Sequence, residues 1–124
     1  MPDLALSELV VEYTSAGDYR VRPIDGLDLT IRAGSLGVIL GPSGCGKTTL
    51  LSCIGGILTP TSGSIHFGDI EVTSLSGAGL LDYRRHVVGI VFQAFNLVPS
   101  LSALENVMVP LRAVKTPRAD ARVL

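Results

Sequence analysis

The sequence predicts an α/β fold, and two observations lead to this prediction. A short apolar run at 36–40 is followed by a glycine-rich loop and then by apolar residues at helical spacing. The first forty residues also indicate β structure, because two stretches before this run alternate apolar and polar types, a pattern typical of half-exposed strands. We therefore expect a strand, a loop and a helix in succession, preceded by a region of β structure.

The composition describes one globular domain. Of the 124 residues, 47% are hydrophobic and 17% are charged, which excludes a disordered chain. The net charge of -1 offers no general attraction for nucleic acid, so no nucleic-acid partner is expected. No signal-like start and no membrane-spanning apolar run are present in the sequence. We therefore expect a cytoplasmic chain without a membrane-spanning segment of its own.

Two strands are expected in the first third of the chain, joined across 15–25, where turn-forming residue types are frequent. The alternating apolar residues are Leu9, Val11 and Tyr13 in the first strand and Leu27, Leu29 and Ile31 in the second. A further small hairpin is expected around Gly68 and Asp69. The resulting β region precedes and follows the glycine-rich loop.

Two apolar runs, 36–40 and 87–92, are expected to form buried strands because they are short and continuous. The helix after the loop is expected to run from Lys47 to the Thr59-Pro60 pair. These elements would place the loop between the end of a strand and the start of a helix.

A second helix is expected after Ser102, which forms a capping-box pattern with Glu105. Pro110 should kink or end this helix. Thr116 and Pro117 have the pattern of another helix start, yet no stop signal follows. We therefore expect the sequence to be a fragment that ends inside a helix.

The glycine-rich loop matches GxxxxGK[ST], the Walker A pattern of a phosphate-binding P-loop. Glycines let backbone N–H groups point at phosphate oxygens, and the helix N-terminus adds partial positive charge. Lys47 would bind the β- and γ-phosphates, and the Thr48 hydroxyl would coordinate Mg²⁺. The residues expected to contact the nucleotide are Gly41, Pro42, Ser43, Gly44, Cys45, Gly46, Lys47, Thr48 and Thr49.

Cys45 has two interpretations. The dipole of the following helix favours a reactive thiolate, whereas the plainer interpretation is a small loop residue without a chemical role. Cys45 and Cys53 match neither a disulfide framework nor a zinc spacing, so both are expected to be reduced. His66 and His86 are interpreted as surface residues.

Three stretches resemble one family in order and in spacing. They are GPSGCGKTTLL from 41, PTSGSI at 60–65 and VGIVFQAFNLVPSLSALENV at 88–107. Over nearly its whole length the chain resembles the ATP-binding subunit of an ABC transporter. Its 95–107 stretch is most similar to lipoprotein-releasing and macrolide-exporter ATPases. The resemblance implies a P-loop NTPase (RecA-like) core with an antiparallel β subdomain, truncated at the start of the helical subdomain.

The resemblance also implies functional residues outside the P-loop. Gln93 corresponds to the Q-loop glutamine, a catalytic residue that approaches Mg²⁺ and the attacking water. Tyr13 resembles the aromatic residue that stacks on adenine, with Tyr19 as the alternative. By the same resemblance the β subdomain covers 1–34, the P-loop core to the Q-loop covers 35–95, and the helical subdomain begins within 96–124.

The partners and cofactors follow from the same resemblance. It implies ATP and Mg²⁺ as cofactors, and transmembrane permease subunits and a second ATP-binding subunit in a head-to-tail dimer as partners. The permeases would hold the protein at the inner face of the cell membrane. The signature motif, the Walker B carboxylates and the switch histidine are expected after 124. The alternatives are a hydrolysis-incompetent fragment with a regulatory role or another P-loop NTPase.

Overall fold

The structure is a computed structural model that describes residues 2–14, 17 and 19–114. The chain divides into two compact units, Met1–Leu80 and Leu81–Leu124, which we call the first unit and the second unit. Each unit is described by itself. The helix α2, Gly77–His86, crosses from one unit into the other.

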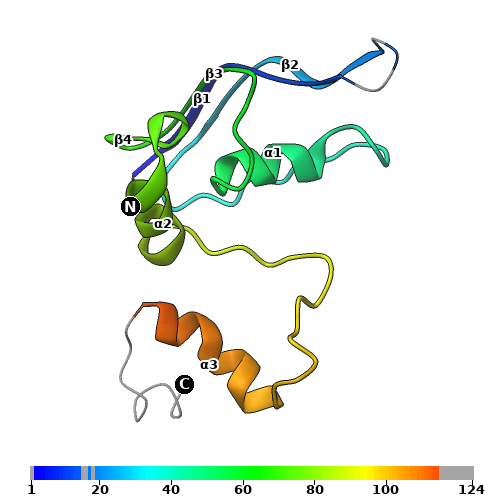
Figure 1. Ribbon diagram of the computed structural model, residues 1–124. Helices are drawn as coiled ribbons and strands as arrows, with labels where there is room; N and C mark the ends of the chain where they lie inside the picture. The colour runs from blue at the N-terminus through cyan, green and yellow to red at the C-terminus, as the bar shows by residue number, and fades with distance from the viewer. Residues whose placement is uncertain (1, 15–16, 18, 115–124) are drawn as a thin grey trace. The chain divides into compact units, whose positions relative to one another are not determined.

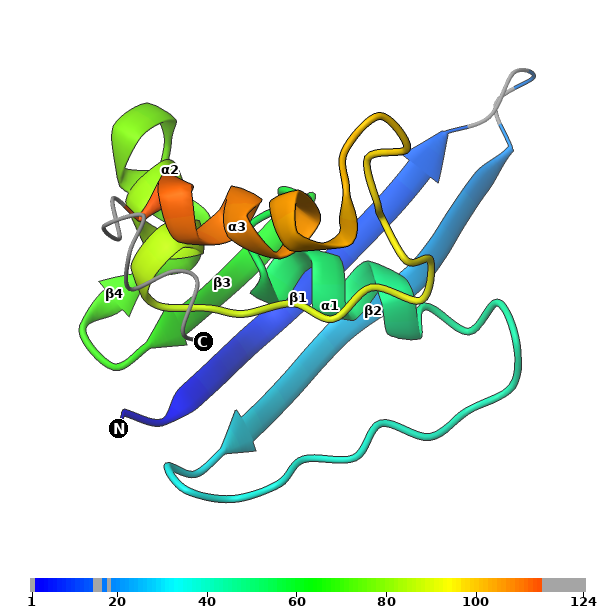
Figure 2. The ribbon, with the colours of Figure 1, turned by 90° about the horizontal axis from the view of Figure 1, so that it is seen from below.

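The first unit contains a four-stranded antiparallel sheet with the strand order β2-β1-β3-β4. Its strands are β1 Leu4–Thr14, β2 Arg20–Ile31, β3 Ser62–Phe67 and β4 Ile70–Glu71, followed by the short 3₁₀ turn η1 Val72–Ser74. Figures 1 and 2 show that the helix α1, Lys47–Ile54, lies across one face of this sheet. The predicted N-terminal strands and the hairpin at Gly68 are confirmed.

The strand β2 begins earlier than predicted. The turn-forming residues of 15–25 suggested a loop, but β2 starts at Arg20 and includes Pro23 and Asp25. Proline is tolerated there because β2 is at the edge of the sheet, where its missing N–H need not serve a second neighbour. The connection between β1 and β2 is therefore shorter than the composition indicated.

A bulge in β1 keeps two core leucines on the same face of the sheet. The pairing register shifts between Leu6 and Leu9, and Glu8 between them has a φ of 47°. The Glu8 N–H donates to Asp28 Oδ1 at 2.8 Å, so the bulged residue keeps a hydrogen-bond partner. Leu6 and Leu9 are 3% and 0% exposed, although three positions apart.

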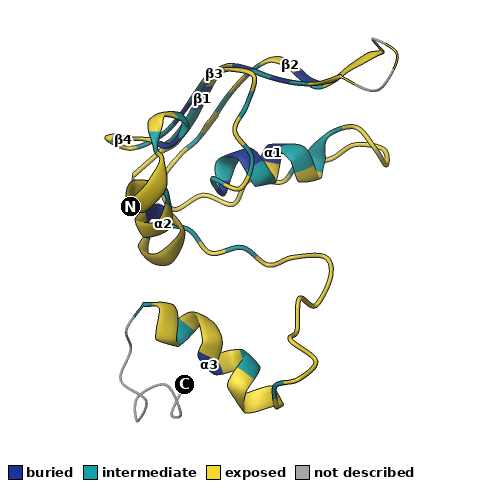
Figure 3. Cartoon of the chain, viewed as in Figure 1, coloured by how far each residue is buried: buried dark blue, intermediate teal, exposed yellow. Residues whose placement is uncertain are grey.

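The core of the first unit lies between the sheet and α1, and Figure 3 shows buried positions on both. Burying each large aliphatic side chain stabilises the fold by about 1.5–3 kcal/mol. The buried hydrophobic residues of this unit are Leu6, Leu9, Val11, Ile24, Leu50, Cys53, Ile65 and Val72.

The helix α1 ends at Ile54, several residues before the predicted stop at Thr59-Pro60. Gly56 has a φ of 65°, and its N–H donates to the Cys53 carbonyl at 3.0 Å. The Ile57 N–H donates to the Ser52 carbonyl at 2.8 Å. This pair of bonds is a Schellman motif, in which a left-handed glycine closes the last turn. The apolar spacing beyond Ile54 therefore belongs to the turn after the helix.

The predicted buried strand at 36–40 is wrong for this structure. Within the described residues this segment pairs with no strand, and Leu36 and Leu40 are 90% and 87% exposed. A buried strand needs neighbours to bond its N–H and C=O groups, and the four paired strands satisfy one another instead. The segment 87–92 of the second unit also forms no strand, and Val91 is fully exposed.

The second unit contains most of α2 and the helix α3, Ala103–Ala113. The capping box of Ser102 and Glu105 is confirmed. Pro110 does not end α3, which continues for three further residues. The predicted helix start at Thr116 lies outside the described residues. Among the helices that the structure describes, none has the length and apolar character to cross a bilayer.

Candidate functional site

The P-loop, residues 41–49, leads directly into α1. The helix begins at Lys47, and its N-cap residue Gly46 has no side chain to accept from the first-turn N–H groups. The first turn also contains no acidic residue. Because these N–H groups carry partial positive charge, the start of α1 is suited to an anion.

The Lys47 side chain folds back over the P-loop. Its Nζ donates to the Gly41 carbonyl at 2.7 Å and to the Pro42 carbonyl at 2.6 Å, and it lies 3.6 Å from Cys45 Sγ. An ammonium group has three donors, and sulfur is a weak acceptor that a phosphate oxygen can replace. Two carbonyls therefore hold the positive charge at the loop and leave one donor for a ligand.

Three glycines of the loop are required for different reasons. A Cβ atom at Gly46, where φ is 98°, would lie 2.6 Å from the Pro23 carbonyl oxygen. At Gly41 it would lie 2.5 Å from Cys45 Sγ. Gly44 has a φ of 80° but open space around it. Backbone packing and a positive φ thus exclude a side chain at Gly46, and a side chain at Gly41 would displace Cys45 Sγ, whereas Gly44 leaves the backbone open to an approaching ligand.

An open hollow of about 340 Å³ adjoins the start of α1. Its lining includes Asp28 from β2, Leu40 before the loop, and Cys45 and Lys47. The hollow therefore gives access to the Lys47 side chain from the side of β2.

The structure groups the P-loop candidates in one segment of the first unit but brings neither candidate tyrosine to the hollow beside Lys47. Tyr13 pairs with Val21 at the end of β1 and is 45% exposed, and Tyr19 is 71% exposed. Neither tyrosine lines the hollow beside Lys47. Gln93 is exposed and belongs to the second unit. The roles of Tyr13 and Gln93 therefore stay predictions.

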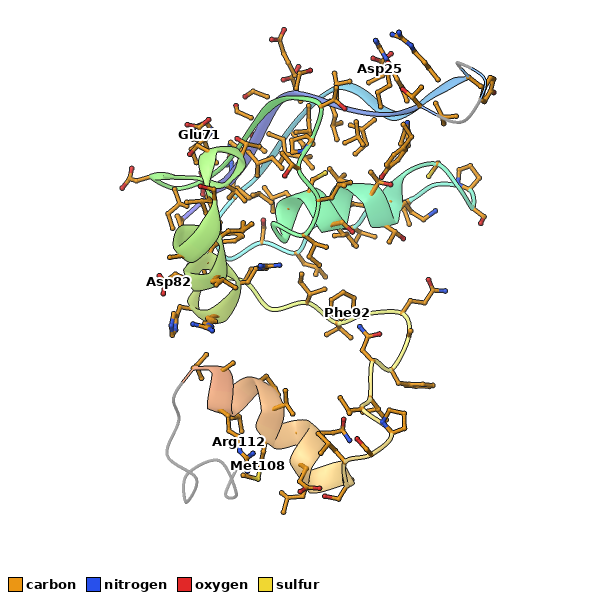
Figure 4. The ribbon with its side chains drawn as sticks, in the orientation of Figure 1. Asp25, Glu71, Asp82, Phe92, Met108 and Arg112 are labelled. Carbon is orange, nitrogen blue, oxygen red and sulfur yellow. The ribbon has the colours of Figure 1, made fainter. Side chains whose placement is uncertain are left out.

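Charged residues brace the hairpin beside Tyr13. Glu12 accepts a hydrogen bond from Arg22 Nε and pairs with Arg20 at 3.5 Å, and Arg22 also pairs with Asp25 (labelled in Figure 4) at 3.3 Å. The hydrogen bond from Arg22 holds the pKa of the Glu12 carboxyl below its ordinary value. The pairing therefore stabilises the folded hairpin fully at pH values above the ordinary pKa of a glutamate carboxyl. This stabilisation is lost as the pH falls through the lowered pKa of Glu12.

Thr61 and Gly63 of the PTSG stretch have structural roles that the sequence did not reveal. The Thr61 Oγ1 accepts from the Glu12 N–H at 2.9 Å, while the Thr61 N–H donates to the Val10 carbonyl at 2.8 Å. A Cβ atom at Gly63, where φ is 85°, would lie 2.4 Å from the Glu8 carbonyl oxygen. A glycine inside a strand signals close backbone approach, and this signal was available in the sequence.

The two cysteines are in opposite environments. Cys45 is exposed in the P-loop, whereas Cys53 on α1 is 1% exposed. Burial raises the pKa of the Cys53 thiol, so this group stays protonated and unreactive at neutral pH. The chain therefore has one accessible thiol at the candidate site and one protected thiol in the core.

A glycine loop that opens onto a helix N-terminus, with a lysine folded over it, defines the class of P-loop nucleotide-binding proteins. The family can be stated as well. The model of the ABC transporter family matches residues 24–124, and the chain belongs to this family.

Individual relatives agree with this assignment. An uncharacterized ABC transporter ATP-binding protein of Mycobacterium tuberculosis (strain ATCC 25618 / H37Rv) is 68% identical over 122 residues, 98% of this chain and 37% of that protein. The lipoprotein-releasing system ATP-binding protein LolD of Geobacter metallireducens is 42% identical over 118 residues, 95% of this chain and 52% of that protein. The macrolide export ATP-binding/permease protein MacB of Brucella abortus is 42% identical over 106 residues, 86% of this chain and 16% of that protein.

A solved structure has the same fold. The dimeric structure of a post-hydrolysis state of the ATP-binding cassette MJ0796, bound to ADP and Pi, superposes with a TM-score of 0.86 at 34% identity. The match covers 97% of this chain and 53% of that chain. The predicted fold class, the N-terminal part of a P-loop NTPase core with an antiparallel β subdomain, is confirmed. The chain spans about half the length of this cassette and 37% of the mycobacterial relative.

Proposed function

We propose that the P-loop binds the phosphates of ATP with Mg²⁺, and that ATP hydrolysis by the whole protein drives transport across a membrane. The observation that supports this most strongly is the position of Lys47 Nζ, bonded to the Gly41 and Pro42 carbonyls beside the uncapped start of α1. A triphosphate fits this donor set, because the ammonium and the helix N–H groups are complementary to phosphate oxygens. The ADP and Pi of the MJ0796 structure are consistent with this chemistry.

Mg²⁺ fits the same site through Thr48, which is exposed in the first turn of α1. A hydroxyl oxygen is a hard ligand of the type that Mg²⁺ accepts, and the ion completes its shell with phosphate and water. When bound, Mg²⁺ offsets charge on the phosphates. Ser43 and Thr49 have no separate role in this proposal beyond their positions in the loop.

Thiol labelling of the protein produced from its complete reading frame tests the proposal. We expect a maleimide to modify the exposed Cys45 quickly and the buried Cys53 slowly, and saturating MgATP to protect Cys45. The protection arises because phosphates in the loop block access to Sγ. Peptide mass spectrometry measures both rates, with Cys53 as internal reference. Equal labelling of Cys45 with and without MgATP would contradict the proposed site.

Gln93 is proposed to orient the attacking water, since an uncharged amide can both donate and accept a hydrogen bond. We expect Gln93→Ala to lower kcat for ATP hydrolysis about tenfold, the value of one lost hydrogen bond, without changing the Kd for MgATP. Steady-state phosphate release and nucleotide titration measure the two constants. An unaltered kcat in Gln93→Ala contradicts the assignment.

The remaining proposals concern the whole protein. Tyr13 is proposed to stack on adenine, because an exposed ring at the end of β1 offers a flat apolar face. The β subdomain, the core and the start of the helical subdomain are proposed at 1–34, 35–95 and 96–124. Permease subunits and a second ATP-binding subunit are the proposed partners, at the inner face of the cell membrane. The dimeric MJ0796 cassette supports the second of these partners.

A further inference from the structure

The Asn106 side chain in the first part of α3 is bonded to the preceding loop on both sides of its amide. Its Oδ1 accepts from the Val98 N–H at 2.8 Å. Its Nδ2 donates to the carbonyls of Val98, Leu101 and Ser102 at 3.2, 3.1 and 3.0 Å. One side chain thus serves a backbone donor and shares its two N–H groups among three carbonyls, of which Val98 and Ser102 also accept from the Leu101 and Asn106 N–H groups.

Glu105, the residue before Asn106, binds the last residue of this loop, Ser102. Glu105 Oε2 accepts from the Ser102 N–H at 2.9 Å and from Ser102 Oγ at 2.7 Å, which completes the capping box. Glu105 therefore holds the start of α3, whereas Asn106 holds the loop 98–102 against it. We call Asn106 and its four bonds the amide anchor.

The chemistry of the amide anchor is specific to asparagine. Its bonds require an acceptor toward the Val98 N–H and two N–H donors that point at neighbouring carbonyls, within a short side chain. Aspartate keeps the acceptor but presents a second oxygen to the carbonyls, and glutamine carries the amide one carbon too far. The anchor therefore depends on the identity of the residue and not on polarity alone.

The anchor shortens the free path between Gln93 and α3. Figure 4 shows Phe92 in the extended segment that leads toward this helix. With Val98 fixed, the five steps from Gln93 span at most about 18 Å, whereas full release to Ser102 gives nine steps and about 32 Å. Without the anchor, the bond from the Leu101 N–H to the Val98 carbonyl still joins these two residues, but neither is held to the Asn106 side chain of α3. The anchor thus lowers the upper limit on the distance between Gln93 and α3.

We infer that Asn106 is a positioning residue for Gln93, acting through the amide anchor on the segment that joins Gln93 to α3. The inference rests on the proposed function of Gln93. Loss of the anchor leaves the hydrogen bonds of Lys47 intact, because they lie within 41–47. It should therefore impair the hydrolytic step and not the binding of nucleotide.

The test uses the protein from its complete reading frame with Asn106→Ala. We expect kcat for ATP hydrolysis to fall about fivefold to tenfold, while KM and the Kd for MgATP stay within about twofold. Hydrogen exchange of the Val98 amide should accelerate, because this N–H loses its acceptor. An unchanged Kd for MgATP shows that the Asn106→Ala variant is folded.

A second variant separates the anchor from general packing. Asn106→Asp should lower kcat at neutral pH and recover activity as pH falls, since a protonated carboxyl regains one donor. The parent protein, whose Asn106 amide does not titrate, is the reference for this pH profile. Parallel pH profiles for Asn106→Asp and the parent protein would overturn the inference.

The remaining outcomes distinguish this inference from the proposed function. A parent protein that binds and hydrolyses ATP, while Asn106→Ala keeps its full kcat, overturns the positioning role alone. A parent protein that binds no MgATP overturns the proposed function and this inference with it. A lower kcat with unchanged Kd and faster Val98 exchange supports both.

Discussion

Replacing Lys47 with alanine is expected to weaken the binding of MgATP by about 1.5–3 kcal/mol, or roughly tenfold to more than a hundredfold in Kd. The loss has two physical sources. The charge-assisted bond to phosphate disappears, and the Gly41 and Pro42 carbonyls lose the ammonium that holds the loop closed. Titration of the protein with a fluorescent ATP analogue in the presence of Mg²⁺ measures the change.

Arg32→Ala is the matched control for this measurement. It removes one positive charge from an exposed position after β2, outside the P-loop. General electrostatic attraction for ATP would weaken binding similarly in both variants, whereas a phosphate site at the loop affects only Lys47→Ala. Native-like unfolding of Lys47→Ala combined with unchanged Kd would remove Lys47 from the proposed site.

Replacing Gly63 with alanine is expected to destabilise the fold by about 3 kcal/mol or more. A non-glycine residue at a φ of 85° costs about 1–2 kcal/mol, and overpacking adds about 1–3 kcal/mol. The new Cβ would lie 2.4 Å from the Glu8 carbonyl oxygen and 2.6 Å from the Leu9 Cα, and these are backbone atoms that cannot rotate away. Denaturant unfolding of the protein measures the difference in free energy.

Gly26→Ala isolates the steric part of this effect. Gly26 has a φ of 66°, but a Cβ atom there meets nothing within 4 Å. In Gly26→Ala only the backbone strain should lower the free energy of unfolding, by about 1–2 kcal/mol. Equal losses in the two variants would show that the contact between β3 and the β1 bulge is not tight.

The parts of the fold that depend on neighbouring residues could be predicted from the sequence. The capping box at Ser102 is one example, because its bonds join positions three apart. The P-loop is another, since its glycines, Lys47 and the start of α1 lie in one short segment. Local hydrogen bonds and backbone preferences determine both features, so their spacing alone identified them.

The features that were not predicted correctly depend on residues far away in the sequence, or on local residue patterns that favour different structures. The apolar run 36–40 is typical of a buried strand, but a strand forms only where other strands bond to it. The apolar residues after Ile54 continued the helical spacing, while Gly56 ended α1. The roles of Gly63 and Asn106 involve contacts across the sheet and across a loop, which no spacing rule describes.

The position of the four strands early in the sequence has a consequence for folding during synthesis. All four strands lie between residues 4 and 71, so every ladder partner has been translated once that stretch has left the ribosome. At about 5–20 residues per second, synthesis of this stretch takes roughly 4–14 s. The antiparallel sheet can thus form co-translationally, while Leu36 and Leu40 stay exposed on the nascent chain. During that interval they are the kind of apolar surface that chaperones bind.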